Sequence, residues 1–143
     1  MHTAASLTQN IRDGLYDQMF SRLYGPENLE TQRRRYEQAV ANFVRTFGER
    51  DNLLLFSAPG RTEVGGNHTD HNHGRVLAAS VNLDIIAIVS AVPAAQIRIQ
   101  SAGYPMDAVR LDDLAVRTGE LNTSAALIRG MAARLTEKGF SVG

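Results

Sequence analysis

The sequence predicts an α+β fold in which helices at the two ends flank a run of strands. Residues 10–47 carry apolar side chains at helical spacing, residues 53–111 contain short apolar runs of strand length, and residues 123–139 return to the helical pattern. This order differs from the regular alternation of strand and helix that a doubly wound sheet requires. With 143 residues, 43% of them hydrophobic and 21% charged, the chain is typical of a globular protein.

Two helices are expected before residue 50. The first covers residues 10–24 and ends at Gly25-Pro26; the second covers residues 29–47 and ends at Gly48, where glycine adopts a left-handed cap most easily. The run Arg33–Arg35 lies on the second helix, and a solvated helix face is favoured over a phosphate grip. The apolar stripes are Ile11, Leu15, Met19, Phe20 and Leu23 in the first helix, and Tyr36, Val40, Phe43, Val44 and Phe47 in the second.

About five strands are expected next, over residues 53–56, 76–81, 83–92, 97–100 and 109–111. The last two are shorter and alternate apolar with polar residues, as half-buried strands do. A final helix then begins at Thr123 or Ser124 as the N-cap and ends before Gly139. Its expected inward residues are Leu127, Ile128, Met131 and Leu135.

The charge balance and the missing cysteines exclude several function classes. Fifteen basic and fifteen acidic residues give no net charge, so nothing favours a nucleic-acid or anionic-membrane partner. The absence of cysteine excludes disulfides, thiolate metal sites and a cysteine nucleophile. No apolar run approaches the roughly 20 residues of a membrane span, and residues 1–10 are unlike a secretory signal. We therefore expect a cytoplasmic protein.

Residues 57–74 form the segment richest in chemistry. Arg61 offers a rigid fork of donors suited to phosphate or a developing oxyanion, and Gly65 and Gly66 allow a ligand to approach the backbone closely. Side chains that suit sugar hydroxyls follow: Asn67, His68, Asp70 and Asn72. A simpler interpretation is a polar turn closed by Asx hydrogen bonds. A metal site is a third, less favoured one, because only a tight loop would bring together His68, Asp70, His71 and His73.

The same segment resembles the galactokinase signature, Gly-Arg-x-Asn-Leu-Ile-Gly-Glu-His-Thr-Asp-Tyr-Asn-x-Gly, which residues 60–74 follow without a gap. The resemblance implies the N-terminal domain of a GHMP-type kinase, of the ribosomal protein S5 domain 2-like fold and incomplete here. Residues 1–50 would be an N-terminal helical extension, and residues 51–143 a partial kinase domain that carries the sugar-binding signature. The matching residues are Gly60, Arg61, Gly66, His68, Thr69, Asp70, Asn72 and Gly74.

For function, the resemblance implies ATP-dependent phosphorylation of galactose, or a related hexose, at the anomeric hydroxyl. Arg61 would be catalytic, stabilising negative charge near the reacting oxygen, while Asn67, His68 and Asp70 would bind the substrate. ATP and Mg²⁺ would serve the parent enzyme, because the family's phosphate-cradling loop and catalytic Asp have no counterpart in this chain. We therefore expect no cofactor-binding or metal residues here, and no kinase activity from these 143 residues alone.

The chain departs from the family pattern at several positions. Asn67 stands where the family has Glu, His71 replaces the Tyr, and Glu63-Val64-Gly65 replaces Asn-Leu-Ile. The identity of the sugar is therefore left open among galactose, galacturonate, an N-acetylated hexosamine and related hexoses. Two alternatives to a kinase also stay open, namely a non-catalytic sugar sensor with a galactokinase-like fold and a free-standing metal-binding domain.

Overall fold

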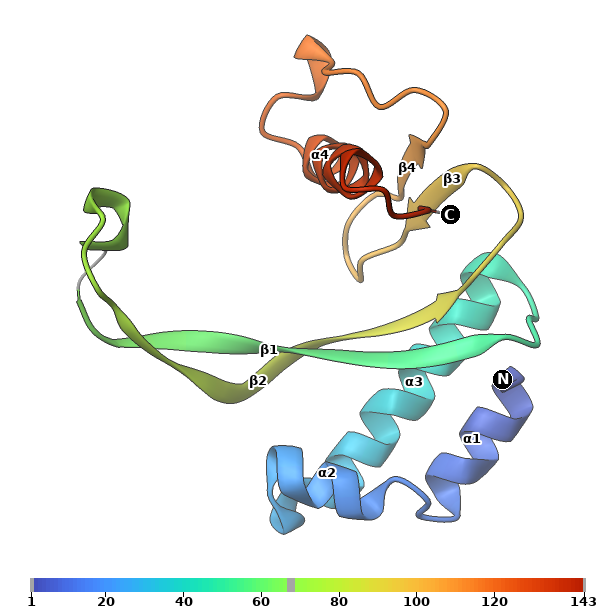
Figure 1. Ribbon diagram of the computed structural model, residues 1–143. Helices are drawn as coiled ribbons and strands as arrows, with labels where there is room; N and C mark the ends of the chain where they lie inside the picture. The colour runs from blue at the N-terminus through green and yellow to red at the C-terminus, as the bar shows by residue number, and fades with distance from the viewer. Residues whose placement is uncertain (1, 67–68, 143) are drawn as a thin grey trace. The chain divides into compact units, whose positions relative to one another are not determined.

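The computed structural model describes residues 2–66 and 69–142, without the side chain of Asp70, and confirms the α+β class. The chain divides into two compact units, Met1–Ser90 and Ala91–Gly143 (Figure 1). The boundary at residue 50, which the sequence predicts between an N-terminal extension and a partial kinase domain, stays a prediction. No helix among the described residues is long and apolar enough to cross a membrane.

The first unit packs three helices on a long hairpin. Its helices are α1 (Ala4–Arg12), α2 (Asp17–Tyr24) and α3 (Leu29–Phe47), with a short 3₁₀ turn, Pro26–Asn28, before α3. Its strands are β1 (Leu53–Gly65) and β2 (Leu77–Ser90), which pair antiparallel, and a second 3₁₀ turn, Thr69–Asn72, lies between them.

The predicted helix over residues 10–24 is wrong in one respect, because the chain forms two helices there. Gly14 adopts φ +77°, which ends α1, and α2 starts at Asp17. The break turns Leu15 into solvent with 67% of its surface exposed, whereas Ile11 and Phe20 are fully buried as expected. Gly25 and Gly48 end α2 and α3 as predicted.

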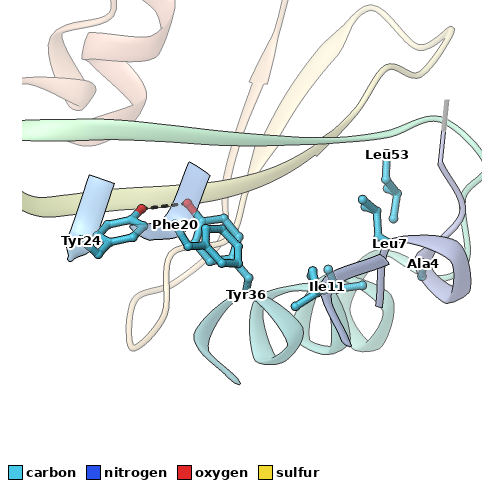
Figure 2. Close-up of a cluster of buried hydrophobic side chains, with 8 residues drawn as sticks. Ala4, Leu7, Ile11, Phe20, Tyr24, Tyr36 and Leu53 are labelled. Carbon is cyan, nitrogen blue, oxygen red and sulfur yellow. Dashed lines mark hydrogen bonds between the residues drawn. The ribbon is translucent and has the colours of Figure 1, made fainter. Parts of the chain in front are cut away.

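The core of the first unit lies between the helices and one face of the hairpin (Figure 2). Successive residues of a strand point to opposite faces, so Leu53 and Leu55 of β1 and Ile86 and Ile88 of β2 meet the helices. The neighbouring residues form the outer face of the hairpin and are exposed, which the apolar sequence alone did not reveal. The large apolar side chains of that outer face are Leu54, Phe56, Ile85 and Val89.

The strand prediction needs two corrections. The strand expected over residues 53–56 continues to Gly65, and the two expected over residues 76–92 are one strand, β2. Polar residues of the signature were read as loop, yet residues up to Gly65 pair with β2 along a twisted ribbon. The described chain thus has four strands rather than about five.

The arginine run on α3 is mostly engaged with acidic partners. Arg33 pairs with Asp17, and Arg35 pairs with Asp84 at 2.6 Å between Nη1 and Oδ1. Only Arg34 has the solvated character expected of the run, with 76% of its side chain exposed beside Glu30.

The second unit contains β3 (Gln96–Ile99) and β4 (Asp107–Arg110), paired antiparallel, a 3₁₀ turn at Thr118–Glu120, and α4 (Ser124–Glu137). Thr123 is the N-cap, since its Oγ1 accepts from the Ala126 amide. The expected inward stripe of α4 is wrong: the helix buries Ala132 and Arg129, whose guanidinium donates to both Glu120 oxygens at 2.8 Å. The expected inward residues that are instead exposed are Leu127, Met131 and Leu135.

Candidate functional site

The signature segment occupies the second half of β1, the turn after it and the start of β2. The ladder is regular from Leu53 to Pro59, which lies opposite Asp84, and then shifts so that Arg61 lies opposite Ser80. Three residues of β2, 81–83, therefore face Gly60 alone, which is a bulge. Gly60 suits this position, because a Cβ there would lie 3.1 Å from the Leu83 carbonyl oxygen.

Of the four predicted site residues, Arg61 is the one whose side chain is described. It lies on β1 just after the bulge and is exposed, and no ion pair joins it to a carboxylate whose side chain the structure describes. Asn67 and His68 lie outside the described residues, and Asp70 is placed only by its backbone in the Thr69–Asn72 turn. The grouping of these four residues in one site therefore stays a prediction.

The turn that carries Asp70 is closed by main-chain hydrogen bonds and by Thr69. The Thr69 amide donates to the Gly66 carbonyl at 2.9 Å, and the Gly74 amide donates to the Thr69 carbonyl at 2.7 Å. The Thr69 hydroxyl also donates to the Arg75 carbonyl at 3.0 Å. These bonds close the described part of the turn, from Thr69 to Gly74.

Gly66 is required by this geometry, and its replacement gives a direct test. It has φ +113°, and a Cβ would lie 2.7 Å from the Arg75 carbonyl oxygen. Gly66→Ala should cost about 1–3 kcal/mol and displace the turn, as measured by urea unfolding and by backbone NMR shifts at residues 69–75. Gly65→Ala is the matched control, since nothing lies within 4 Å of a Cβ there. Equal effects of the two substitutions would contradict the described turn.

The metal interpretation gains no support from the described residues. Among them, no three His, Cys, Asp or Glu side chains come together where they could hold an ion. His71 and His73 are both exposed, and His73 has φ +59°. Because His68 and the Asp70 side chain fall outside the description, the metal-binding alternative stays an untested prediction.

A buried polar cluster lies where the signature half of the hairpin begins, and the sequence analysis missed it. Asp84 of β2, whose side chain is 3% exposed, accepts hydrogen bonds from Tyr24, Arg35 and Ser57. Burial alone would raise the pKa of Asp84, but these three hydrogen bonds outweigh it and hold the pKa below its ordinary value. One signal was available, because Asp84 is the sole charged residue between Leu77 and Ser90.

Tyr36, which contacts Tyr24 of this cluster, also has a shifted pKa. Burial, together with the hydrogen bond between Tyr36 and Tyr24, raises the pKa of Tyr36 well above its ordinary value. Their hydroxyl oxygens lie 2.8 Å apart (Figure 2). Tyr36 therefore stays neutral and able to donate over the whole physiological pH range.

Comparison with known proteins gives a consistent result. The galactokinase galactose-binding signature matches residues 41–91, which include β1, the turn and β2. The chain is 28% identical over 103 residues to the galactokinase of Lactococcus lactis subsp. cremoris (strain MG1363), and 28% over 109 residues to that of Bacillus subtilis (strain 168). It is 31% identical over 104 residues to the galactokinase of Lactobacillus helveticus.

These alignments cover 70%, 74% and 71% of this chain but 25%, 27% and 26% of the relatives, so the chain spans about a quarter of the length of the proteins it matches. No solved structure matches the chain. The matched segment includes the whole hairpin. Residues 60–74, which carry the resemblance to the galactokinase signature, lie within it. By this signature and these relatives, the chain is similar to galactokinases over a segment that corresponds to about a quarter of their length.

Proposed function

We propose that this chain is the sugar-binding part of a galactokinase-like kinase, which phosphorylates galactose or a related hexose at the anomeric hydroxyl with ATP. The observation that carries the proposal is the match of the galactose-binding signature to residues 41–91. The chain would form an incomplete N-terminal domain of a GHMP-type kinase with the ribosomal protein S5 domain 2-like fold, and the enzyme would act in the cytoplasm.

Arg61 is assigned the catalytic role in this proposal. Its guanidinium is exposed, its strand is paired on one side, and its charge is permanent at physiological pH. A fixed cation beside the reacting oxygen lowers the barrier to phosphoryl transfer, because negative charge spreads over the oxygens of the transferred group. Asn67, His68 and Asp70 are assigned to the sugar hydroxyls, since amide, imidazole and carboxylate groups supply the directional donors and acceptors that hydroxyls need.

ATP and Mg²⁺ have no fitting site in the described part of this chain. Among the described residues, no three His, Cys, Asp or Glu side chains come together where they could hold a metal ion, and we propose that the glycine- and serine-rich loop that would hold the phosphates lies outside these 143 residues. The proposal therefore places nucleotide and metal binding in the remainder of a longer parent protein. No step of the reaction is assigned to residues of this chain beyond sugar binding and charge stabilisation.

The deciding experiment compares the parent protein with residues 1–143 in a coupled assay of ADP release against a panel of hexoses. We expect sugar-dependent turnover by the parent and none by the 143-residue chain, because positioning of the phosphates is most of phosphoryl-transfer catalysis. Turnover by the short chain would contradict the assignment of the nucleotide site. A parent that binds galactose but never releases ADP would instead support the sugar-sensor alternative, which Asn67 in place of the family Glu favours.

Asn67 provides a test of sugar selectivity. A carboxylate that accepts a hydroxyl proton makes a charge-assisted bond, which is stronger than the bond of a neutral amide by about 1 kcal/mol. Asn67→Glu in the parent should therefore tighten galactose binding by that amount and weaken binding of galacturonate, as measured by calorimetric titration of both sugars. Asn10→Glu, which lies on α1 and outside residues 41–91, serves as the control. Unchanged affinities for both sugars would remove Asn67 from the sugar site.

A further inference from the structure

Four side chains from four different elements converge on the root of the signature. They are Tyr24 at the end of α2, Arg35 on α3, Ser57 on β1 and Asp84 on β2. Asp84 Oδ1 accepts from Arg35 Nη1 at 2.6 Å, and Asp84 Oδ2 accepts from the hydroxyls of Tyr24 and Ser57, both at 2.5 Å. Both carboxylate oxygens are thus satisfied, which a nearly fully buried charge requires.

The direction of the hydrogen bonds is determined by the number of protons. Tyr24 has a single hydroxyl proton, which it donates to Asp84, so the 2.8 Å contact with Tyr36 must have Tyr36 as the donor. Arg35 also donates through Nη2 to the main-chain carbonyl of Asp84 at 2.9 Å. One guanidinium therefore holds both the side chain and the backbone of the same strand residue.

The position of Asp84 along the hairpin gives the cluster its significance. Asp84 lies opposite Pro59, the last regular pair before the bulge that leads to Arg61. Beyond that pair, every described residue from Gly60 to Ser80 is exposed except the half-buried Gly66. In the described part of this segment, no side chain is buried against the helices, so the direction in which the signature half leaves the core is determined at Asp84.

We propose that Asp84, Tyr24, Arg35 and Ser57 form a positioning cluster that orients the signature half of the hairpin, and with it Arg61, relative to the helices before residue 50. The chemistry explains why a polar cluster occupies this position among apolar neighbours such as Ile86 and Leu55. Apolar contacts tolerate sliding, whereas three directional bonds to one carboxylate allow a single register, and a slip by one residue would turn Asp84 to the outer face. Residues 1–50 are thereby part of the site and not an appendage to it. The claim about orientation stands on geometry alone; its catalytic consequence rests on the proposed function.

Amide hydrogen exchange on the full 143-residue chain tests the orientation claim without any sugar. Tyr24→Phe removes one hydroxyl and keeps the ring that packs 6.3 Å from Phe20. We expect exchange at residues 61–63 and 78–80 to accelerate about tenfold, the effect of losing one bond to a charged group, while β3 and β4 are unchanged. The matched control is Tyr16→Phe, which makes the same chemical change beside the same core, 6.1 Å from Phe20. Ser57→Ala, which removes the donor on β1, should reproduce the result of Tyr24→Phe.

Equal protection in Tyr24→Phe and Tyr16→Phe would overturn the proposal, and so would a uniform loss over the whole unit, because that is what a merely structural residue produces. The catalytic arm uses the parent enzyme, where Tyr24→Phe should lower kcat/KM about tenfold and Tyr16→Phe should leave it unchanged. If the parent shows no kinase activity, the proposed function fails while hydrogen exchange still decides the orientation claim. If exchange changes and kcat/KM does not, the cluster orients the hairpin but does not position a catalytic Arg61, and the proposal fails in that part.

Discussion

Arg61→Ala should lower the turnover of the parent enzyme by about 10²–10³, with a much smaller change in the apparent affinity for the sugar. The reason is that the proposed partner of Arg61 is charge that develops only in the transition state, so its removal affects kcat and kcat/KM alike. Arg61 is exposed and contributes no buried contact, so the fold should be unaffected. The measurement is steady-state kinetics with galactose, combined with a thermal unfolding curve for the variant.

The chain offers a matched control in Arg75. This second exposed arginine lies just before β2 and outside the matching signature positions. Arg75→Ala should change turnover less than about threefold, because no role in the reaction is assigned to its side chain and its exposed charge is screened by solvent and salt. If both variants lose activity equally, the effect is one of general charge, and the assignment to Arg61 is wrong. If Arg61→Ala changes only the sugar affinity, the residue binds substrate and does not stabilise the transition state.

Asp84→Ala should destabilise the first unit by about 3 kcal/mol, the largest stability effect that we expect from a single substitution of a charged residue in this unit. The substitution leaves the Arg35 guanidinium, the buried Tyr24 hydroxyl and the exposed Ser57 hydroxyl without their common acceptor, and an unsatisfied buried group costs more than the bond itself gains. Arg35 is about one-third exposed, so water recovers part of the loss and the effect stays below that of a fully buried pair. Urea unfolding followed by circular dichroism measures it. Asp112→Ala, which breaks a solvent-exposed pair with Arg110, is the control and should cost far less.

The same carboxylate predicts an acid dependence. The pKa of Asp84 is lower in the folded protein than its ordinary value of 3.8, so the folded state binds its proton less readily than the unfolded state does. Its contribution is therefore complete above about pH 4 and is lost as the pH falls through the folded-state pKa. The difference in unfolding free energy between wild type and Asp84→Ala should shrink below pH 4 and stay constant from pH 5 to 8. A difference that is constant down to pH 2 would show that the pKa of Asp84 is the same in the folded and unfolded states, which would contradict the hydrogen bonds assigned to its carboxylate.

Local signals in the sequence were sufficient for most of the fold. Helix ends at Gly25 and Gly48, the Thr123 cap and the α+β class all follow from short-range chemistry, and the structure confirms them. The errors arose where the backbone conformation differs from what residue type and spacing suggest. Gly14 lies within the helix expected over residues 10–24, although its left-handed backbone divides that helix. The expected strand stops at residue 56 because residues 57–65 are mostly polar, yet the strand continues to Gly65. Periodicity does not show which face of a strand or helix finds a partner, which is why the direction of α4 was wrong.

The candidate site was predictable in a different way. Residues 60–74 stood out by composition and by the resemblance, and the family match confirms the identification. What lay beyond the sequence was the cluster around Asp84, because Tyr24 and Arg35 are 60 and 49 positions away from Asp84 and ordinary in their own neighbourhoods. An aspartate in an apolar strand indicates that a partner exists, but the identity of that partner depends on the packing of α2 and α3 against the hairpin.

The two-stranded form of the hairpin has a consequence for how the chain behaves at high concentration. Within the part of the chain that the structure describes, β1 and β2 pair only with each other along their length, apart from one bridge between His2 and Leu53, so each strand leaves one row of amides and carbonyls open. Open edges of this kind template strand addition between molecules, and nature usually blocks them with charge. β1 has Arg61 and Glu63 for this purpose, whereas the single charge of β2, Asp84, is turned inward and neutralised by Arg35. Aggregation of the isolated chain should therefore begin along β2, and a lysine at an outward position such as Ile85 is the gatekeeper substitution that would suppress it.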